Sequence, residues 1–278
     1  MSERTVLFSL DQIGTGAMRF PSGAPVPSQS DAGVDPYFHT RVSKHVQVET
    51  VMFWPQVKET FPGLVLLHEW WGLNSQIKDQ ATRLACEGYV VIVPNLYVRL
   101  GGMVTASAEL AETLMGRLNE KDALQDINSC CEFLNTRDHA KRNVHGVVGV
   151  GMGGALAIQF AGQRRRLRAA VAFYGTVPAP ANGLKDLCCP LQYHRAGLDD
   201  VVTVDDLERL RDAGQRSGKQ VDIRMYENAR PSFCNEARKE TYHPQAAQQA
   251  FEATIEFLGS CFEGAAAPPF PAQGVPFR

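Results

Sequence analysis

The stretch VVGVGMGGALA, residues 147–157, decides the fold of this chain. Its valines are typical of a buried strand, its glycines of a tight turn, and its final small residues of a helix packed closely on that strand. One interpretation is the dinucleotide fingerprint G-x-G-x-x-G, which would set a pyrophosphate at the helix N-terminus. That fingerprint needs an acid at the end of the next strand to hold the ribose. The next strand ends Phe173-Tyr174-Gly175 without a carboxylate, which argues against it.

A nucleophile elbow, G-x-Nuc-x-G, is the better interpretation of the same turn. Small residues flank the nucleophile in such a turn so that strand and helix can approach around a strained backbone position. The nucleophile position here is Gly151. Glycine relieves the strain but has no hydroxyl or thiol with which to attack an acyl carbon.

Short apolar runs alternate with amphipathic, helix-length runs on both sides of the turn. This alternation predicts βαβ units and a mostly parallel, doubly wound sheet with helices on both faces. Val42–Thr50 followed by Val51–Trp54 allows an antiparallel hairpin at the start. The expected strands are 63–68, 89–94, 144–148, 169–174, 191–195 and 221–226, and the expected helical segments are 74–87, 106–136 and 204–217.

Composition excludes several classes of function. The 28 basic and 30 acidic residues give a net charge of −2, which lacks the basic footprint of a nucleic-acid binder. No apolar run approaches the length of a membrane span, and the start of the chain does not resemble a signal peptide. The seven cysteines lack metal-ligand spacing, so we expect no disulfide framework, metal or cofactor and a reducing, cytoplasmic location.

Proline and glycine divide the chain into three regions. Residues 1–40 are expected to form an extended N-terminal arm, residues 41–263 the folded domain, and residues 264–278 a proline-rich tail. The apolar side chains of the two end regions cannot be buried within those regions. A protein partner contacting them is therefore the expectation, with wrapping around the chain's own domain as the alternative.

Several motifs in fixed order resemble the dienelactone hydrolase family of α/β-hydrolases over about residues 41–260. They are HEWWGLN (68–74), EGYVVIVPNLY (87–97), the glycine turn, AFYG (172–175), GLDD (197–200), and residues 226–235 followed by 242–258.

The resemblance implies an α/β-hydrolase fold and a Cys-His-Asp triad, with a glutamate near the cysteine and an arginine that receives a substrate carboxylate. Carried over residue by residue, the cysteine position falls on Gly151 and the histidine position on Pro231, in the stretch RPSF. The acid falls on Asp199, the glutamate on Glu69 and the arginine on Arg99.

Other residues are candidates for replacing the missing groups. His68 and His243 are candidate bases and Ser232 and Cys234 candidate nucleophiles, although structural roles are expected for both histidines and for Cys234. A vestigial pocket for a small anionic ligand is expected around Glu69, Trp70, Trp71, Arg99 and Met152. One of the two indoles is expected to fill the space over Gly151, or both to pack in the core.

Two functions from different classes remain open. The first is a catalytically silent pseudoenzyme that binds or assembles within a larger intracellular structure such as the cytoskeleton. The second is a hydrolase of small esters or lactones with relocated catalytic groups, or else a small-molecule sensor.

Overall fold

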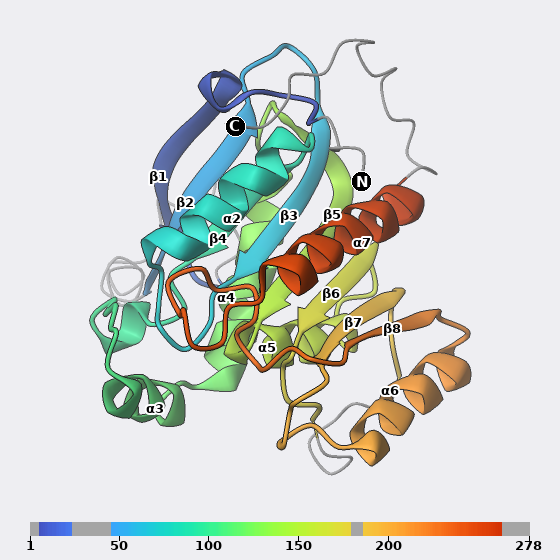
Figure 1. Ribbon diagram of the computed structural model, residues 1–278. Helices are drawn as coiled ribbons and strands as arrows, with labels where there is room; N and C mark the ends of the chain where they lie inside the picture. The colour runs from blue at the N-terminus through green and yellow to red at the C-terminus, as the bar shows by residue number, and fades with distance from the viewer. Residues whose placement is uncertain (1–5, 24–45, 179–185, 263–278) are drawn as a thin grey trace, which may run out of the picture.

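A computed structural model describes residues 6–23, 46–178 and 186–262 (Figure 1). Its centre is one eight-stranded sheet with the strand order β1-β2-β4-β3-β5-β6-β7-β8. β1 is antiparallel to β2 and β2 to β4, whereas the other neighbours are parallel. The strands are β1 Ile13–Pro21, β2 Gln47–Pro55, β3 Phe61–Leu67, β4 Val90–Pro94, β5 Ala140–Val150, β6 Ala169–Phe173, β7 Leu191–Ala196 and β8 Val221–Tyr226.

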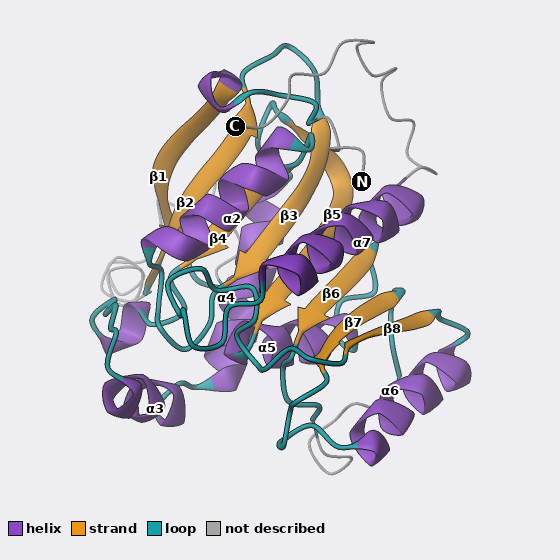
Figure 2. Cartoon of the chain, viewed as in Figure 1, coloured by secondary structure: helices purple, strands orange, loops and turns teal. Residues whose placement is uncertain are grey.

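Helices cover both faces of the sheet, as Figure 2 shows. Side chains of α2 and α7 belong to one hydrophobic core cluster, and those of α4, α5 and α6 to the other. The helices are α2 Ser75–Cys86, α3 Ala108–Gly116, α4 Glu120–Leu134, α5 Met152–Ala161, α6 Val204–Ser217 and α7 Pro244–Phe262, with short 3₁₀ turns η1 Leu10–Gln12 and η3 Val98–Leu100. This is the α/β-hydrolase fold, so the predicted fold class is confirmed.

The central strands form because their residues can be buried on both faces. Every residue of β4 and β6 is buried, as expected of parallel strands with helices on each side. Polar caps then fix where helices begin. Asn74 accepts a hydrogen bond from the Ile77 N–H at the start of α2, and Thr203 and Asp206 form a capping box at the start of α6.

Two predictions about local structure were wrong. The helical segment 106–136 is divided into α3 and α4, because α3 ends at Gly116 and Asn119 caps a new helix. The hairpin within residues 42–54 is absent from its described part. Gln47–Pro55 is one continuous strand, which pairs with β1 over nine residue pairs on one side and with β4 on the other.

The prediction of an extended arm is wrong for the described part of residues 1–40. Residues 13–21 form β1 and belong to the sheet. Val6, Phe8 and Phe20 are buried, and Phe8 meets Phe61 edge to face with 5.5 Å between ring centroids. Residues 6–23 therefore complete the domain; residues 24–40 and the predicted tail 264–278 lie outside the described residues.

Replacing Phe8 by alanine tests whether this segment is part of the core. We expect Phe8→Ala to lower the free energy of unfolding by about 3 kcal/mol in urea titrations, because it leaves a cavity beside Phe61. Leu10→Ala is the matched control, since Leu10 is 56% exposed and its loss should change stability by less than about 0.5 kcal/mol. Equal small effects would show that the segment is detached from the domain.

Candidate active site at the elbow

The elbow lies where β5 ends and α5 begins. Gly151 has φ 55° and ψ −116°, a conformation that other residues rarely adopt, and its N–H donates to the Phe173 carbonyl at 2.9 Å. A Cβ added to Gly153 would stand 2.4 Å from the Leu67 carbonyl oxygen. Glycine at 153 thus allows α5 to pack directly against the end of β3.

Glu69 faces the side-chain position that Gly151 leaves empty. A Cβ added at residue 151 would meet Glu69 Cγ and Oε1 at 3.5 Å, which is ordinary van der Waals contact. The three atoms nearest to that Cβ all belong to Glu69. The expectation that an indole fills this space was therefore wrong.

The Glu69 carboxylate is 5% exposed and is held by two side chains from one loop. Ser232 Oγ donates to Oε1 at 2.9 Å, and Asn235 Nδ2 donates to Oε2 at 2.7 Å. Burial raises the pKa of Glu69, while these two donors and the charge of Arg238 oppose the increase. The Glu69 carboxylate thus joins the Ser232 hydroxyl on one side to the Asn235 amide on the other through hydrogen bonds.

The loop between β8 and α7 fixes the position of Ser232. Ser232 has φ 67°, an uncommon conformation for a residue other than glycine, and the neighbouring Phe233 is fully buried. Gln76 and Gln80 of α2 donate to the Cys234 carbonyl at 3.2 and 3.4 Å. The loop is thereby attached to α2 and presents Ser232 to the elbow.

Backbone N–H groups complete the elbow. The N–H groups of Trp70 and Met152 have no hydrogen-bond acceptor among the described residues. Met152 follows the elbow residue and begins α5, and Trp70 lies in the loop after β3. In this fold an oxyanion hole takes one N–H from the residue after the elbow and one from the loop after that strand. Gly151, Met152, Trp70 and Ser232 are all half-buried, so the site is accessible to solvent.

The other two predicted triad positions, Asp199 and Pro231, do not form an acid–base pair. Asp199 Oδ1 accepts the N–H groups of Val201 and Val202 at 2.9 and 3.1 Å, which stabilises its own turn. Pro231 has no proton-handling group. Asp199 thus has a structural role in the loop after β7.

His68 is a structural residue and not a displaced base. Its Nδ1 lies 2.7 Å from the Glu69 carbonyl oxygen, and its Nε2 accepts the Leu96 N–H at 3.1 Å. Both ring nitrogens are occupied, and burial lowers the pKa of His68 to about 4. His243 Nδ1 accepts the Ala246 N–H in the first turn of α7. Burial raises the pKa of Cys234 well above its ordinary value, so its thiol stays protonated.

The structure assigns Arg99 a role other than the predicted one. Its guanidinium pairs with the buried Asp126, lies 3.5 Å from Asp122, and donates to Ser22 Oγ at 3.0 Å. These contacts join the end of β1 to α4 and occupy the groups that a substrate carboxylate would need. The expectation that Arg99 lines the elbow pocket was wrong.

The cation beside the elbow is Arg238, which the sequence analysis missed. Its guanidinium carbon lies 3.6 Å from the Trp71 ring centroid, and its charge acts on Glu69. Trp71 is buried and Trp70 half-buried, with 4.9 Å between their ring centroids. Asn235 was missed as well. It ends the matching stretch 226–235, but the resemblance gives it no role, and Arg238 lies outside the matching stretches.

No helix of the described chain is long and apolar enough to cross a membrane. Among the same residues, no group of three or more His, Cys, Asp or Glu side chains is placed to hold a metal ion.

The sheet topology and the elbow define an α/β-hydrolase-type protein. The Dienelactone hydrolase family model matches residues 48–262, and the chain belongs to this family. It is 30% identical over 206 residues to "Protein usf" of Aquifex pyrophilus, covering 71% of this chain and 87% of the relative.

Two solved structures show the same fold. One is a dienelactone hydrolase-like promiscuous phosphotriesterase from metagenomic libraries, with TM-score 0.73, 16% identity, and coverage of 90% of this chain and 99% of that one. The other is Thermogutta terrifontis esterase 2 phosphonylated by sarin, with TM-score 0.61, 15% identity, and coverage of 80% and 92%.

The structural role of Arg99 predicts a large effect on stability. Arg99→Met should lower the free energy of unfolding by about 3 kcal/mol, because it leaves the buried Asp126 carboxylate without its partner. The double variant Arg99→Met with Asp126→Asn should recover part of this loss in urea titrations. A fully stable single variant would contradict the assignment.

The lowered pKa of His68 predicts a stability that depends on pH. As pH falls from about 6.5 to about 4, the unfolded chain binds a proton that the folded His68 does not, so stability decreases by up to about 1.4 kcal/mol per pH unit for this group. The buried His145 and His194, whose pKa values are also lowered, contribute in the same direction.

His68→Asn should therefore show a shallower decrease than the wild type in urea titrations between pH 6.5 and 4. It should also be less stable at pH 7, because it loses the bond to Leu96. Identical pH slopes for the two proteins would mean that His68 has the same pKa in the folded and the unfolded chain.

Proposed function

We propose that the protein hydrolyses small esters or lactones at the elbow, with Ser232 as nucleophile and Glu69 as general base. The observation that carries this proposal is the 2.9 Å hydrogen bond from Ser232 Oγ to the buried Glu69 carboxylate, beside the empty side-chain position of Gly151. A hydroxyl within hydrogen-bond reach of a base, with that base oriented by a third group, is the general pattern of an activated nucleophile. Asn235 is the third group.

The proposed reaction has two steps. Ser232 Oγ attacks the acyl carbon while its proton passes to Glu69, and the tetrahedral intermediate expels the alcohol as Glu69 returns the proton to it. Water then attacks the acyl-serine with Glu69 as base, which releases the acid and restores the hydroxyl. The N–H groups of Trp70 and Met152 would stabilise the oxyanion in both steps.

Two features support this chemistry over the ordinary triad. The raised pKa of Glu69 brings the carboxylate closer to the neutral range in which a general base is most effective. The absence of a side chain at Gly151 leaves room beside Glu69 for the acyl group of a small substrate. The family name and the esterase from Thermogutta terrifontis are consistent with ester or lactone hydrolysis.

A catalytically silent binding protein is the second candidate. The observation that favours it is the combination of glycine at the elbow and proline at the position that the resemblance assigns to the histidine. In this case the Ser232–Glu69 hydrogen bond only stabilises the loop. Such a protein would act by binding within a larger assembly.

Hydrolysis of p-nitrophenyl acetate and labelling with a fluorophosphonate probe separate the two candidates. We expect turnover above the buffer rate and a probe adduct that peptide mapping places on Ser232. Ser232→Ala should abolish the adduct, and both Ser232→Ala and Glu69→Gln should lower kcat/KM by at least about 100-fold, because the members of such a unit act together.

Cys234→Ala is the matched control on the same loop and should retain labelling and turnover. Turnover at the buffer rate with no adduct would overturn the proposal in favour of the binding protein. Turnover that survives Ser232→Ala would show that another group is the nucleophile.

A further inference from the structure

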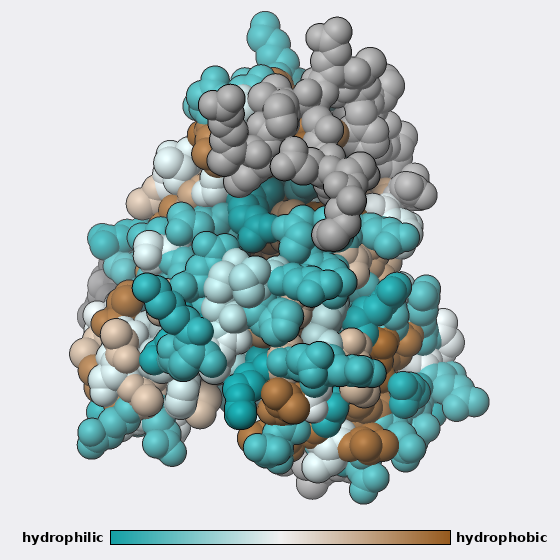
Figure 3. Space-filling view, viewed as in Figure 1, coloured by the Kyte–Doolittle hydropathy of each residue, from teal (hydrophilic) through white to brown (hydrophobic). Residues whose placement is uncertain are grey.

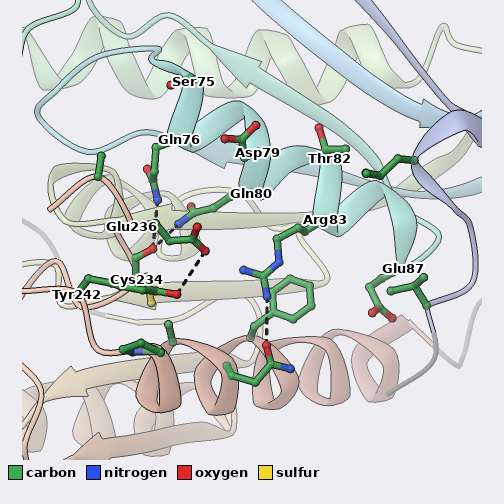
Figure 4. A pocket seen from close by; sticks show the side chains of 17 residues that line it. Ser75, Gln76, Asp79, Gln80, Thr82, Arg83, Glu87, Cys234, Glu236 and Tyr242 are labelled. Carbon is green, nitrogen blue, oxygen red and sulfur yellow. Dashed lines mark hydrogen bonds between the residues drawn. The ribbon is translucent and has the colours of Figure 1, made fainter. Parts of the chain in front are cut away.

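A second cavity lies between α2 and α7, separate from the hydroxyl–carboxylate pair at the elbow (Figure 4). Its volume is about 680 Å³, within the range of small-molecule sites in proteins. Side chains of α2 from Ser75 to Arg83 form one wall and those of α7 from Pro244 to Phe251 the other, while Val6 and Leu10 line it from the N-terminal segment. We call this cavity the α2–α7 groove.

Arg83 is the cation of the α2–α7 groove. Its guanidinium carbon lies 4.3 Å from the centroid of the Phe251 ring, and Nη2 donates to Gln248 Oε1 at 3.3 Å. In Figure 4 the side chain extends from α2 toward α7. No carboxylate of the described residues lies within ion-pairing distance of it, so its charge has no partner of opposite sign there.

An apolar annex opens beside Arg83. This smaller cavity has a volume of about 40 Å³ and is also lined by Arg83. This volume can hold a few groups the size of a water molecule, such as the methylene and methyl groups of a short alkyl chain. The other side chains that make it apolar are Leu66, Leu84, Val148, Val150, Phe173 and Phe251.

The charges around the groove favour an anion with a single charge. Asp79 and Glu236 are exposed at the rim. The described part of the face that carries α2 and α7 is predominantly hydrophilic (Figure 3). Glu87 lies at the opposite end of α2 from Gln76 (Figure 4). A cation at the annex would meet the unpaired charge of Arg83, whereas a multiply charged anion would be repelled by the carboxylates. A ligand with a single carboxylate would pair with Arg83 and would be repelled less by the carboxylates at the rim.

We propose that the α2–α7 groove binds a short-chain monocarboxylate, with its carboxylate on Arg83 and its alkyl chain in the annex. Binding there does not require hydrolysis at the elbow. Val150 immediately precedes Gly151, and the Phe173 carbonyl accepts the Gly151 N–H. The alkyl chain of the ligand would therefore lie directly behind the elbow.

Titration of the full-length protein with butanoate, followed by NMR chemical shifts, tests the proposal. We expect saturable binding with a Kd of about 1 mM and the largest shifts at residues of the groove. Acetate should bind about 10-fold more weakly, because it lacks two methylene groups to bury in the annex. Butylammonium, which has the same chain and the opposite charge, should not bind.

Three variants locate the site. Arg83→Gln should weaken butanoate binding at least about 10-fold by removing the charge-assisted hydrogen bonds. Ala247→Leu places a larger side chain at the annex and should weaken butanoate more than acetate. Arg211→Gln, on the exposed face of α6, is the matched control and should bind as the wild type does.

Circular dichroism and melting temperature show whether each variant is folded. Three results would overturn the proposal: no saturable binding below about 50 mM butanoate, equal affinity for acetate and butanoate, or unchanged binding by a folded Arg83→Gln variant. All of these measure binding, so they stand apart from whether the elbow hydrolyses esters.

Discussion

The close contact between the start of α5 and the end of β3 is the constraint on which the site depends. Gly153 has no room for a side chain under the Leu67 carbonyl, so the helix begins immediately against the strand. This contact turns the chain at Gly151 and sets the first N–H groups of α5 opposite the loop that carries Glu69. The carboxylate, the empty side-chain position and the Met152 N–H, which has no acceptor in the described part of the chain, are brought together by one backbone arrangement.

Glu69 shows how a buried charge can organise a loop. A carboxylate removed from water is costly unless donors compensate for it. Ser232, Asn235 and Arg238 all come from the segment between β8 and α7, so their attraction to Glu69 holds that segment over the elbow. The hydrogen bonds that compensate the buried carboxylate therefore also place the Ser232 hydroxyl beside it.

The sequence predicted the sheet well and the site only in part. Strands such as β4 are apolar throughout, and a short apolar run between two helix-length segments is best explained as a buried strand. β1 was missed because Gly14, Gly16 and Pro21 weaken its pattern, and its stability comes from pairing with β2. Arg99 was misplaced because its partner Asp126 is 27 residues away. Glu69 and Ser232 were each named, yet 163 residues separate them and only the folded chain shows that they are hydrogen-bonded.

The empty position at Gly151 also has a consequence for the genetics of this site. Every glycine codon that ends in a pyrimidine becomes a serine or cysteine codon by one base change, and a proline codon of the same kind becomes a histidine codon by one change. A side chain at residue 151 would meet Glu69 at ordinary contact distance, so the elbow has space for a nucleophile, although the φ of 55° would strain any residue other than glycine. With codons of these kinds, one base change would place a serine or cysteine at the elbow and one more would place a histidine at residue 231.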